Sequence, residues 1–286
     1  MNKMFFKNNR CRLMDKVAEN SLVIIFAGKA PKKSADEAYP FTPNRNFYYV
    51  TGIDEENIIF LTSKVNGETE EYLFIPKSDP VMEKWVGRTI SNEEAIEASG
   101  IEKVLFLDEF ESKLHKLLLN PEMEYIYMDL ERDSWEAQRT HAEDFAKTVT
   151  EKYPYIRVKD VYSYFCQLRL IKSEEEVGLV RAAIDITRDG IMNLMKNIQP
   201  GMKEYEIEAH FDFVLKSRGV KDYAFKTIAA SGKNATVLHY VENGAVTGNE
   251  DLVLLDLGAQ YKYYNADITR TFPVSGKFTE RQKLIY

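Results

Sequence analysis

Short β-rich runs alternate with helical patterns from Ser21 to about Tyr153, and this alternation constrains the fold more than any other feature of the sequence. The β-rich runs, each bounded by Gly, Pro, Asn or Asp, are Leu22–Phe26, Asn57–Thr62, Tyr72–Ile75, Val104–Leu107 and Tyr125–Met128. The helical patterns that fall between or after them are Asn92–Ala98, Phe110–Leu118 and Trp135–Lys152. Such an order is typical of an α/β domain with one sheet.

A different pattern begins after the segment 168–172. Ser173 and Glu176 have capping-box spacing, and apolar residues then recur at helical spacing up to Pro200-Gly201, which predicts one long amphipathic helix. A second helix is expected from about Lys203 to Gly219. The β-rich runs that follow are Thr227–Ala230, Leu252–Leu257 and Ile268–Phe272. We therefore predict two domains, residues 1–170 and residues 171–286.

Composition narrows the functional classes. The net charge of −7 argues against a nucleic-acid partner, whose phosphates require a basic face. No apolar run approaches the ~18 residues of a membrane-spanning helix, and the N-terminus lacks a secretory signal, so a cytoplasmic location is expected. Cys11 and Cys166 have no disulfide or zinc-site spacing.

The last residues begin a helical pattern that is not followed by a C-terminal cap. Thr279 and Gln282 have capping-box spacing, and an apolar face starts at Leu284, yet the sequence stops at Tyr286. An isolated helix of fewer than ~12 residues is marginal. We therefore expect this chain to be part of a longer one, with unpaired strand edges that favour dimers or aggregates.

Two aspartates are candidate metal ligands. Asp256 ends the apolar run Leu252–Leu257, and Asp267 follows it by eleven residues. A hairpin centred between Tyr261 and Lys262 would make these two residues direct cross-strand partners, with Cβ atoms ~4.5–5.5 Å apart, close enough to share cations. Asp is also common in turns, so the spacing alone leaves the pairing open.

His239 is the candidate catalytic residue. It follows the segment 230–235, whose small residues can bring the backbone close to a ligand. A single His in an apolar stretch is also typical of a hydrogen-bonded core residue. Gly232-Lys233 does not form a phosphate loop, because Asn234 stands where Ser or Thr is required.

Taken together, these segments resemble the aminopeptidase P branch of the pita-bread metallohydrolases. In the second domain the similar segments are Ala229–Ala235, Leu238–Tyr240, Asp256–Ala259 and Ala266–Pro273. In the first they are Ser34–Asp36, Tyr39–Phe41, Asn46–Gly52 and Trp85–Arg88. The fold implied is an α/β N-terminal domain of the aminopeptidase P type followed by the first half of an α+β pita-bread catalytic domain.

The resemblance also implies roles for single residues. Asp256 and Asp267 would be the first ligands of two divalent ions, with the remaining His and Glu ligands downstream of this sequence. Mn²⁺ suits such an oxygen-rich set best, with Co²⁺ or Zn²⁺ possible. His239 would contact the substrate, and Trp85 would reach the active site of a neighbouring subunit, although an indole is also often a core residue.

The implied activity is removal of the N-terminal residue from peptides with proline in second position, by a homodimer or homotetramer. These proline-containing peptides are the expected partners, with no nucleic acid and no membrane. With its site incomplete, the 286-residue chain is expected to be inactive alone. Two alternatives remain open: a prolidase that cleaves Xaa-Pro dipeptides, and a non-catalytic pita-bread module that binds peptides or proteins.

Overall fold

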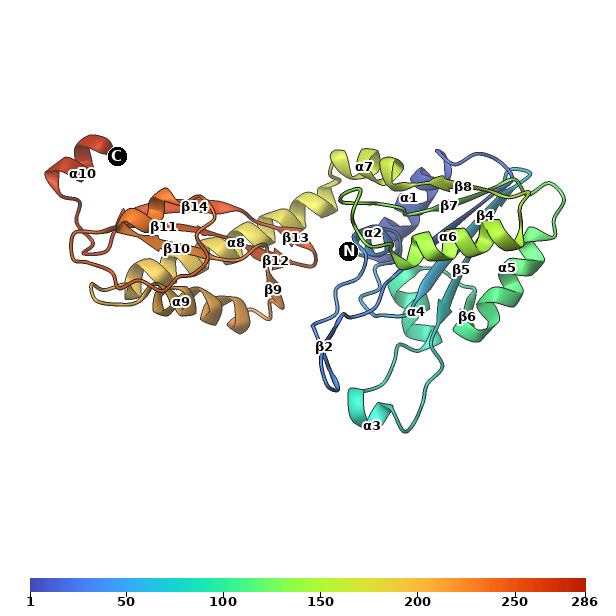
Figure 1. The fold of residues 1–286 in the computed structure, drawn as a ribbon, viewed down its shortest axis with the longest axis horizontal. Coiled ribbons are helices and arrows are strands. Elements are labelled where there is room, and N and C mark those ends of the chain that lie inside the picture. The colour runs from blue at the N-terminus through green and yellow to red at the C-terminus, as the bar shows by residue number, and fades with distance from the viewer. The chain divides into compact units, whose positions relative to one another are not determined.

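The structure is a computed structural model that describes residues 1–286, and the chain divides into two compact units, Met1–Ile171 and Lys172–Tyr286 (Figure 1). None of its helices combines the length and the apolar content that crossing a membrane requires.

The first unit is built on a six-stranded sheet of order β6-β5-β4-β1-β7-β8. Its strands are β1 (Ser21–Phe26), β4 (Ile59–Val65), β5 (Glu68–Ile75), β6 (Val104–Phe106), β7 (Tyr125–Met128) and β8 (Arg157–Asp160). The central strand β1 runs antiparallel to β4 and parallel to β7. A two-stranded ribbon, β2 (Lys32–Ser34) with β3 (Glu37–Ala38), lies outside this sheet.

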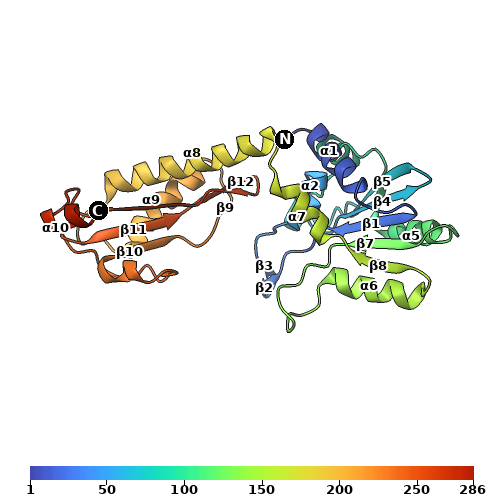
Figure 2. The same ribbon diagram turned by 90° about the horizontal axis from the view of Figure 1, so that it is seen from above.

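Helices cover both faces of this sheet, and two cores result (Figure 2). Residues of α1 (Lys3–Met14), α2 (Arg45–Thr51), α4 (Asn92–Ser99) and α7 (Tyr162–Leu170) pack on the face that carries Val23 and Ile25. Residues of α5 (Phe110–Leu118) and α6 (His141–Lys152) pack on the face that carries Leu22 and Ile24. Burial on both faces explains why β1 is apolar at successive positions rather than at alternate ones.

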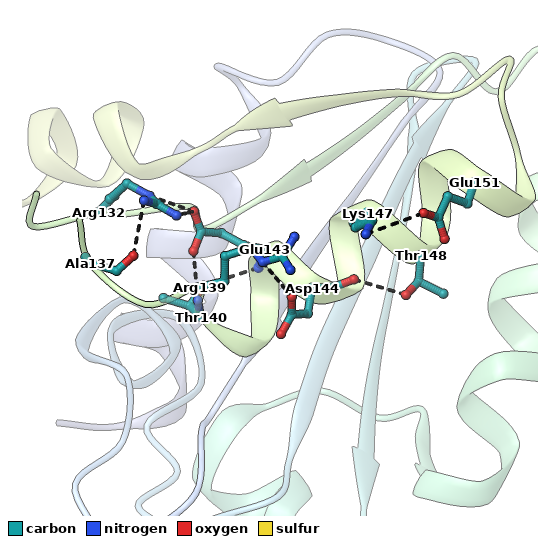
Figure 3. Close-up of polar contacts among 9 residues, drawn as sticks. All are labelled: Arg132, Ala137, Arg139, Thr140, Glu143, Asp144, Lys147, Thr148 and Glu151. Carbon is teal, nitrogen blue, oxygen red and sulfur yellow. Dashed lines mark hydrogen bonds and ion pairs between the residues drawn. The ribbon is translucent and has the colours of Figure 1, made fainter. Parts of the chain in front are cut away.

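The predicted strands and helices of this unit all form, with several boundaries moved: the strand predicted over 57–62 covers 59–65, the strand predicted from Tyr72 begins at Glu68, and one helix begins later than predicted. The helix predicted from Trp135 begins at His141, because Thr140 caps it. The Thr140 hydroxyl accepts from the Glu143 N–H, and the Glu143 carboxylate accepts from the Thr140 N–H and binds Arg132 (Figure 3). This capping box, and not the apolar pattern upstream, sets the start of the helix.

The second unit begins with the long helix α8 (Glu174–Asn197), whose Ser173–Glu176 capping box forms as predicted. The helix α9 (Glu204–Ser217) follows. A three-stranded sheet has the order β10-β11-β14, with β10 (Ile228–Ser231), β11 (Leu252–Leu257) and β14 (Ile268–Pro273). A second sheet joins β13 (Tyr264–Asn265), β12 (Ala259–Tyr261) and β9 (Asp222–Tyr223), and the helix α10 (Glu280–Ile285) ends the chain.

One face of the second unit's sheet is covered by its two long helices (Figure 2). Val253, Leu255 and Leu257 point toward α8 and α9 and are fully buried with them. The residues between them along β11 are only partly buried, the last of them being Asp256. Strand alternation therefore places Asp256 on the face opposite the helices.

Candidate active site

The two candidate ligands lie on one antiparallel ribbon, and its turn sets their register. Lys262 and Tyr263 form a two-residue turn, both with positive φ (48° and 68°), between the paired residues Tyr261 and Tyr264. Positive φ at both central positions is the signature of a type I′ hairpin turn. The ribbon is thus centred between Lys262 and Tyr263.

This register corrects the predicted pairing. Asp256 lies opposite Thr269, and the two aspartates are diagonal neighbours rather than direct partners. The prediction placed the turn one residue too early, because no Asn-Gly or Asp-Gly marks it. Moving the centre by one residue shifts the pairing by two, so both acids keep the same face of the ribbon, with diagonal neighbours ~7–8 Å apart.

Thr269 is a site residue that sequence reasoning missed. Its hydroxyl donates to the Asp256 carboxylate at 2.7 Å between Oγ1 and Oδ1. The bond leaves the second carboxylate oxygen, Oδ2, available to a ligand. The alternation of Asp267, Thr269 and Thr271 along one strand face is the signal that could have identified Thr269.

Gly258 is required where the ribbon passes between the two acids. A Cβ at this position would lie 1.8 Å from the carbonyl oxygen of Ala266, a contact that no side chain permits. Gly258 is also the residue that the ribbon register sets opposite Asp267, which is exposed. No side chain therefore covers Asp267 from the neighbouring strand.

The donor chemistry of the ribbon fits two ligands of a hard divalent cation. Carboxylate oxygens suit Mn²⁺ and similar ions, and both carboxylates occupy the sheet face that the helices leave open. No group of three or more His, Cys, Asp or Glu side chains is placed to hold a metal ion. Asp256 and Asp267 would therefore supply part of a metal site and not the whole of it.

His239 lies on an exposed loop and not in the core. The loop leaves β10 through a short 3-10 turn, Gly232–Thr236, and His239 follows in a turn next to Leu238, which is 88% exposed. This placement removes the interpretation of His239 as a buried, hydrogen-bonded histidine. The imidazole is accessible to a ligand.

Trp85 is likewise not a core residue. It lies in the four-residue helix α3 (Glu83–Val86) of the first unit, and its side chain is 81% exposed. An indole with this exposure is available for a contact outside its own unit.

Comparison with known proteins assigns the chain to a family. A model of the aminopeptidase P N-terminal domain matches residues 6–127, and a model of metallopeptidase family M24 matches residues 178–286. A Bacillus anthracis structure assigned to aminopeptidase P is 54% identical, with a TM-score of 0.97 over 100% of this chain and 68% of that one. The chain belongs to the aminopeptidase P family.

Curated members of the aminopeptidase P family are longer than this chain. The Xaa-Pro aminopeptidase of Escherichia coli is 33% identical over 98% of the chain, which spans 64% of that protein's length. Solved structures of the E. coli aminopeptidase P are 30% identical, with TM-scores of 0.88 and 0.90 over 99% of this chain and 65% of theirs. They include a zinc-substituted form in complex with product and variants in which one aspartate is replaced by alanine.

Proposed function

We propose that the protein acts as a metal-dependent Xaa-Pro aminopeptidase, with residues 1–170 as the N-terminal domain and residues 171–286 as part of the pita-bread catalytic domain. The observation that carries this proposal is the pair Asp256 and Asp267 on the open face of one ribbon, inside the segment that matches family M24. Two E. coli aminopeptidase P structures carry aspartate-to-alanine changes eleven positions apart, the spacing of this pair.

Four residues of the chain would have separate roles in this activity. Asp256 and Asp267 would hold the cations, and the Thr269 hydroxyl would orient the Asp256 carboxylate toward them. His239 would hydrogen-bond the peptide from its exposed loop. Divalent ions at such a site supply polarisation of a carbonyl and activation of water at neutral pH.

A substrate with proline in second position fits these residue roles. The Xaa-Pro bond is a tertiary amide without an N–H, so a site cannot recognise it through that donor. The accessible imidazole of His239 and the cations that Asp256 and Asp267 would hold would instead recognise the free amine and the carbonyl oxygen. The proposed ion is Mn²⁺, with Co²⁺ or Zn²⁺ as alternatives, because the oxygen donors accept all three.

The proposal includes an assembly of two or four copies in the cytoplasm that acts on free peptides. The exposed Trp85 supports an assembly, since an indole at 81% exposure is suited to a contact with a second copy. The charge of −7 is unsuited to nucleic acid. Sedimentation at micromolar concentration tests this part of the proposal, and a monomer would contradict it.

The activity is tested with Mn²⁺ and the tripeptide Ala-Pro-Ala, in a preparation that includes any residues that follow Tyr286 in the gene. We expect release of the N-terminal alanine, and a loss of at least about 100-fold in Asp267→Asn, because metal-site substitutions act on the ions directly. Asp222→Asn, an exposed aspartate of the same unit, is the matched control. Asp267→Asn activity within tenfold of wild type would contradict the assignment.

The same assay separates the two rival functions. A prolidase would cleave the dipeptide Ala-Pro and leave the tripeptide intact. A non-catalytic binding module would stay free of metal and inert after Mn²⁺ addition. The position of Asp256 and Asp267 as diagonal neighbours on one face of the ribbon disfavours the binding module, because two nearby carboxylates repel each other unless a cation neutralises them.

A further inference from the structure

Glu204 is a buried carboxylate that the proposed chemistry does not use. It is the first residue of α9, and its side chain has no exposed surface. A buried carboxylate is costly unless hydrogen bonds compensate for its lost hydration. Its contacts therefore indicate what it holds in place.

Glu204 joins the two ends of the loop that follows β10. One carboxylate oxygen, Oε1, accepts from the Ser231 N–H and hydroxyl, both at 2.7 Å, and from the Asn234 amide at 3.2 Å. The other, Oε2, accepts from the Tyr240 hydroxyl at 2.7 Å and from the Ala245 N–H at 2.9 Å. Five donors from both ends of the loop thus converge on one side chain.

These donors flank the candidate histidine. Ser231 and Asn234 precede His239, while Tyr240 and Ala245 follow it. The Asn234 amide also donates to the Tyr240 hydroxyl at 3.1 Å, which links the two ends directly. Between these bonds the loop tip, residues 237–239, is exposed. The bonds thus fix where the tip can lie without covering it.

We propose that Glu204 is the positioning residue for His239: by binding both ends of the 231–245 loop it holds the exposed imidazole in one place. The hydrogen bonds alone support the role of Glu204 in ordering the loop. The role of the ordered loop in peptide cleavage rests on the function proposed above.

The chemistry of the contact favours a glutamate over its amide. Both carboxylate oxygens act as acceptors here, and a glutamine has one oxygen and an NH₂ group that only donates. In Glu204→Gln either the Ser231 N–H or the Ala245 N–H would face a donor, since a backbone N–H cannot accept. One end of the loop would then lose its attachment while the helix keeps its length.

Amide hydrogen exchange on the 286-residue chain tests the positioning. In Glu204→Gln we expect the amides of residues 231–245 to exchange at least about 10-fold faster, with α8 and β11 unchanged. Glu206→Gln is the matched control, because Glu206 lies on the same helix and accepts only from the Lys203 N–H. It should leave loop exchange within about twofold of wild type. Unchanged loop exchange in Glu204→Gln would overturn the proposal.

A double-mutant cycle tests the link to His239 in a preparation that cleaves Ala-Pro-Ala. We expect Glu204→Gln to lower kcat/KM at least about 10-fold in wild type and to change it less than about twofold in a His239→Ala background. Equal losses in both backgrounds would show that Glu204 acts independently of His239 and would overturn the proposal. A wild-type protein without turnover would contradict the proposed function, and loop exchange would still decide the role of Glu204.

Discussion

Each unit of the molecule contains a buried acid, and the surroundings of Glu204 and Asp129 can be compared directly. Glu204 in the second unit has no exposed surface, and Asp129 in the first is 8% exposed. Glu204 accepts five hydrogen bonds shared between its two oxygens. Asp129 accepts two, from the amides of Asn44 and Asn46, both on Oδ2, while its Oδ1 has no partner.

This difference in hydrogen bonding shifts the pKa values of the two acids in opposite directions. Burial raises the pKa of Asp129, and the amides of Asn46 and Asn44 oppose this only in part. Burial also acts to raise the pKa of Glu204, but hydrogen bonds from Ser231, Tyr240 and Ala245 outweigh it, and the pKa is lowered. Two buried acids thus have pKa values shifted in opposite directions, and the acid with more hydrogen-bond donors is the one whose pKa is lowered.

Glu204→Ala should give the largest effect. The substitution leaves several donors without their acceptor in a buried place, so we expect a loss of about 3–5 kcal/mol in the free energy of unfolding. Urea denaturation followed by circular dichroism measures it. Glu206→Ala, which removes a single capping contact, should cost about 1 kcal/mol or less. Similar losses for the two variants would remove the distinction between Glu204 and an ordinary helix-start acid.

Tyr240→Phe removes one of the five donors and should have an intermediate effect. The Tyr240 hydroxyl donates to the Glu204 carboxylate in a part-buried hydrogen bond, which is charge-assisted because the carboxylate is ionised. We expect a loss of about 1–2 kcal/mol in the free energy of unfolding. The same change in a Glu204→Ala background should have a smaller effect, and equal losses in both backgrounds would contradict the shared network.

Most of the fold was predictable from local patterns, because its strands are buried and its helices are capped by their own residues. The exceptions depend on distant contacts. The helix α1 was not predicted, since its Arg10 looks like a surface residue. In the structure the Arg10 guanidinium is buried, donates to the Val50 and Ser99 carbonyls and pairs with Glu71 at 2.9 Å. No sequence pattern within α1 predicts these contacts of Arg10.

The candidate site also combines features that local patterns predict with features that depend on distant contacts. The shared face of Asp256 and Asp267 follows from strand alternation, and only their register depended on a turn, Lys262-Tyr263, without a characteristic sequence. Glu204 was missed because an acid in the first turn of a helix is common. The signal for it lies 27 residues away, where Ser231 begins a run of small polar residues that need an acceptor.

The pH dependence of stability should differ in sign between the two acids. The Glu204 pKa is lowered from 4.5, so its contribution is full above that pH and is lost as the pH falls through the folded-state pKa. The Asp129 pKa is raised from 3.8, so its contribution is full below that pH and is lost as the pH rises. Between about pH 3 and pH 7 the cost of Glu204→Gln should therefore grow up to about pH 4.5 and then stay constant, while Asp129→Asn should become relatively more favourable as the pH rises above 3.8.

Thermal unfolding of each variant and wild type across this pH range measures both trends. A common slope for the two variants would mean that burial alone governs these acids and that the hydrogen-bond count does not matter. The wild-type curve by itself does not decide the question, because it sums the contributions of every titratable group in the protein.

Asp129→Asn at pH 7 should give the smallest effect and the opposite sign. An asparagine oxygen can accept from the Asn44 and Asn46 amides as the carboxylate does. The change removes the charge of a carboxylate whose Oδ1 has no hydrogen-bond donor. It also places an NH₂ group at the position of Oδ1, so we expect the free energy of unfolding to rise by only about 0–1 kcal/mol. The matched control is Asp144→Asn, which breaks an exposed ion pair with Arg139 at 3.2 Å (Figure 3) and should cost less than about 0.5 kcal/mol. A loss above about 2 kcal/mol in Asp129→Asn would mean that the charge itself is stabilised, and that Asp129 and Glu204 are alike after all.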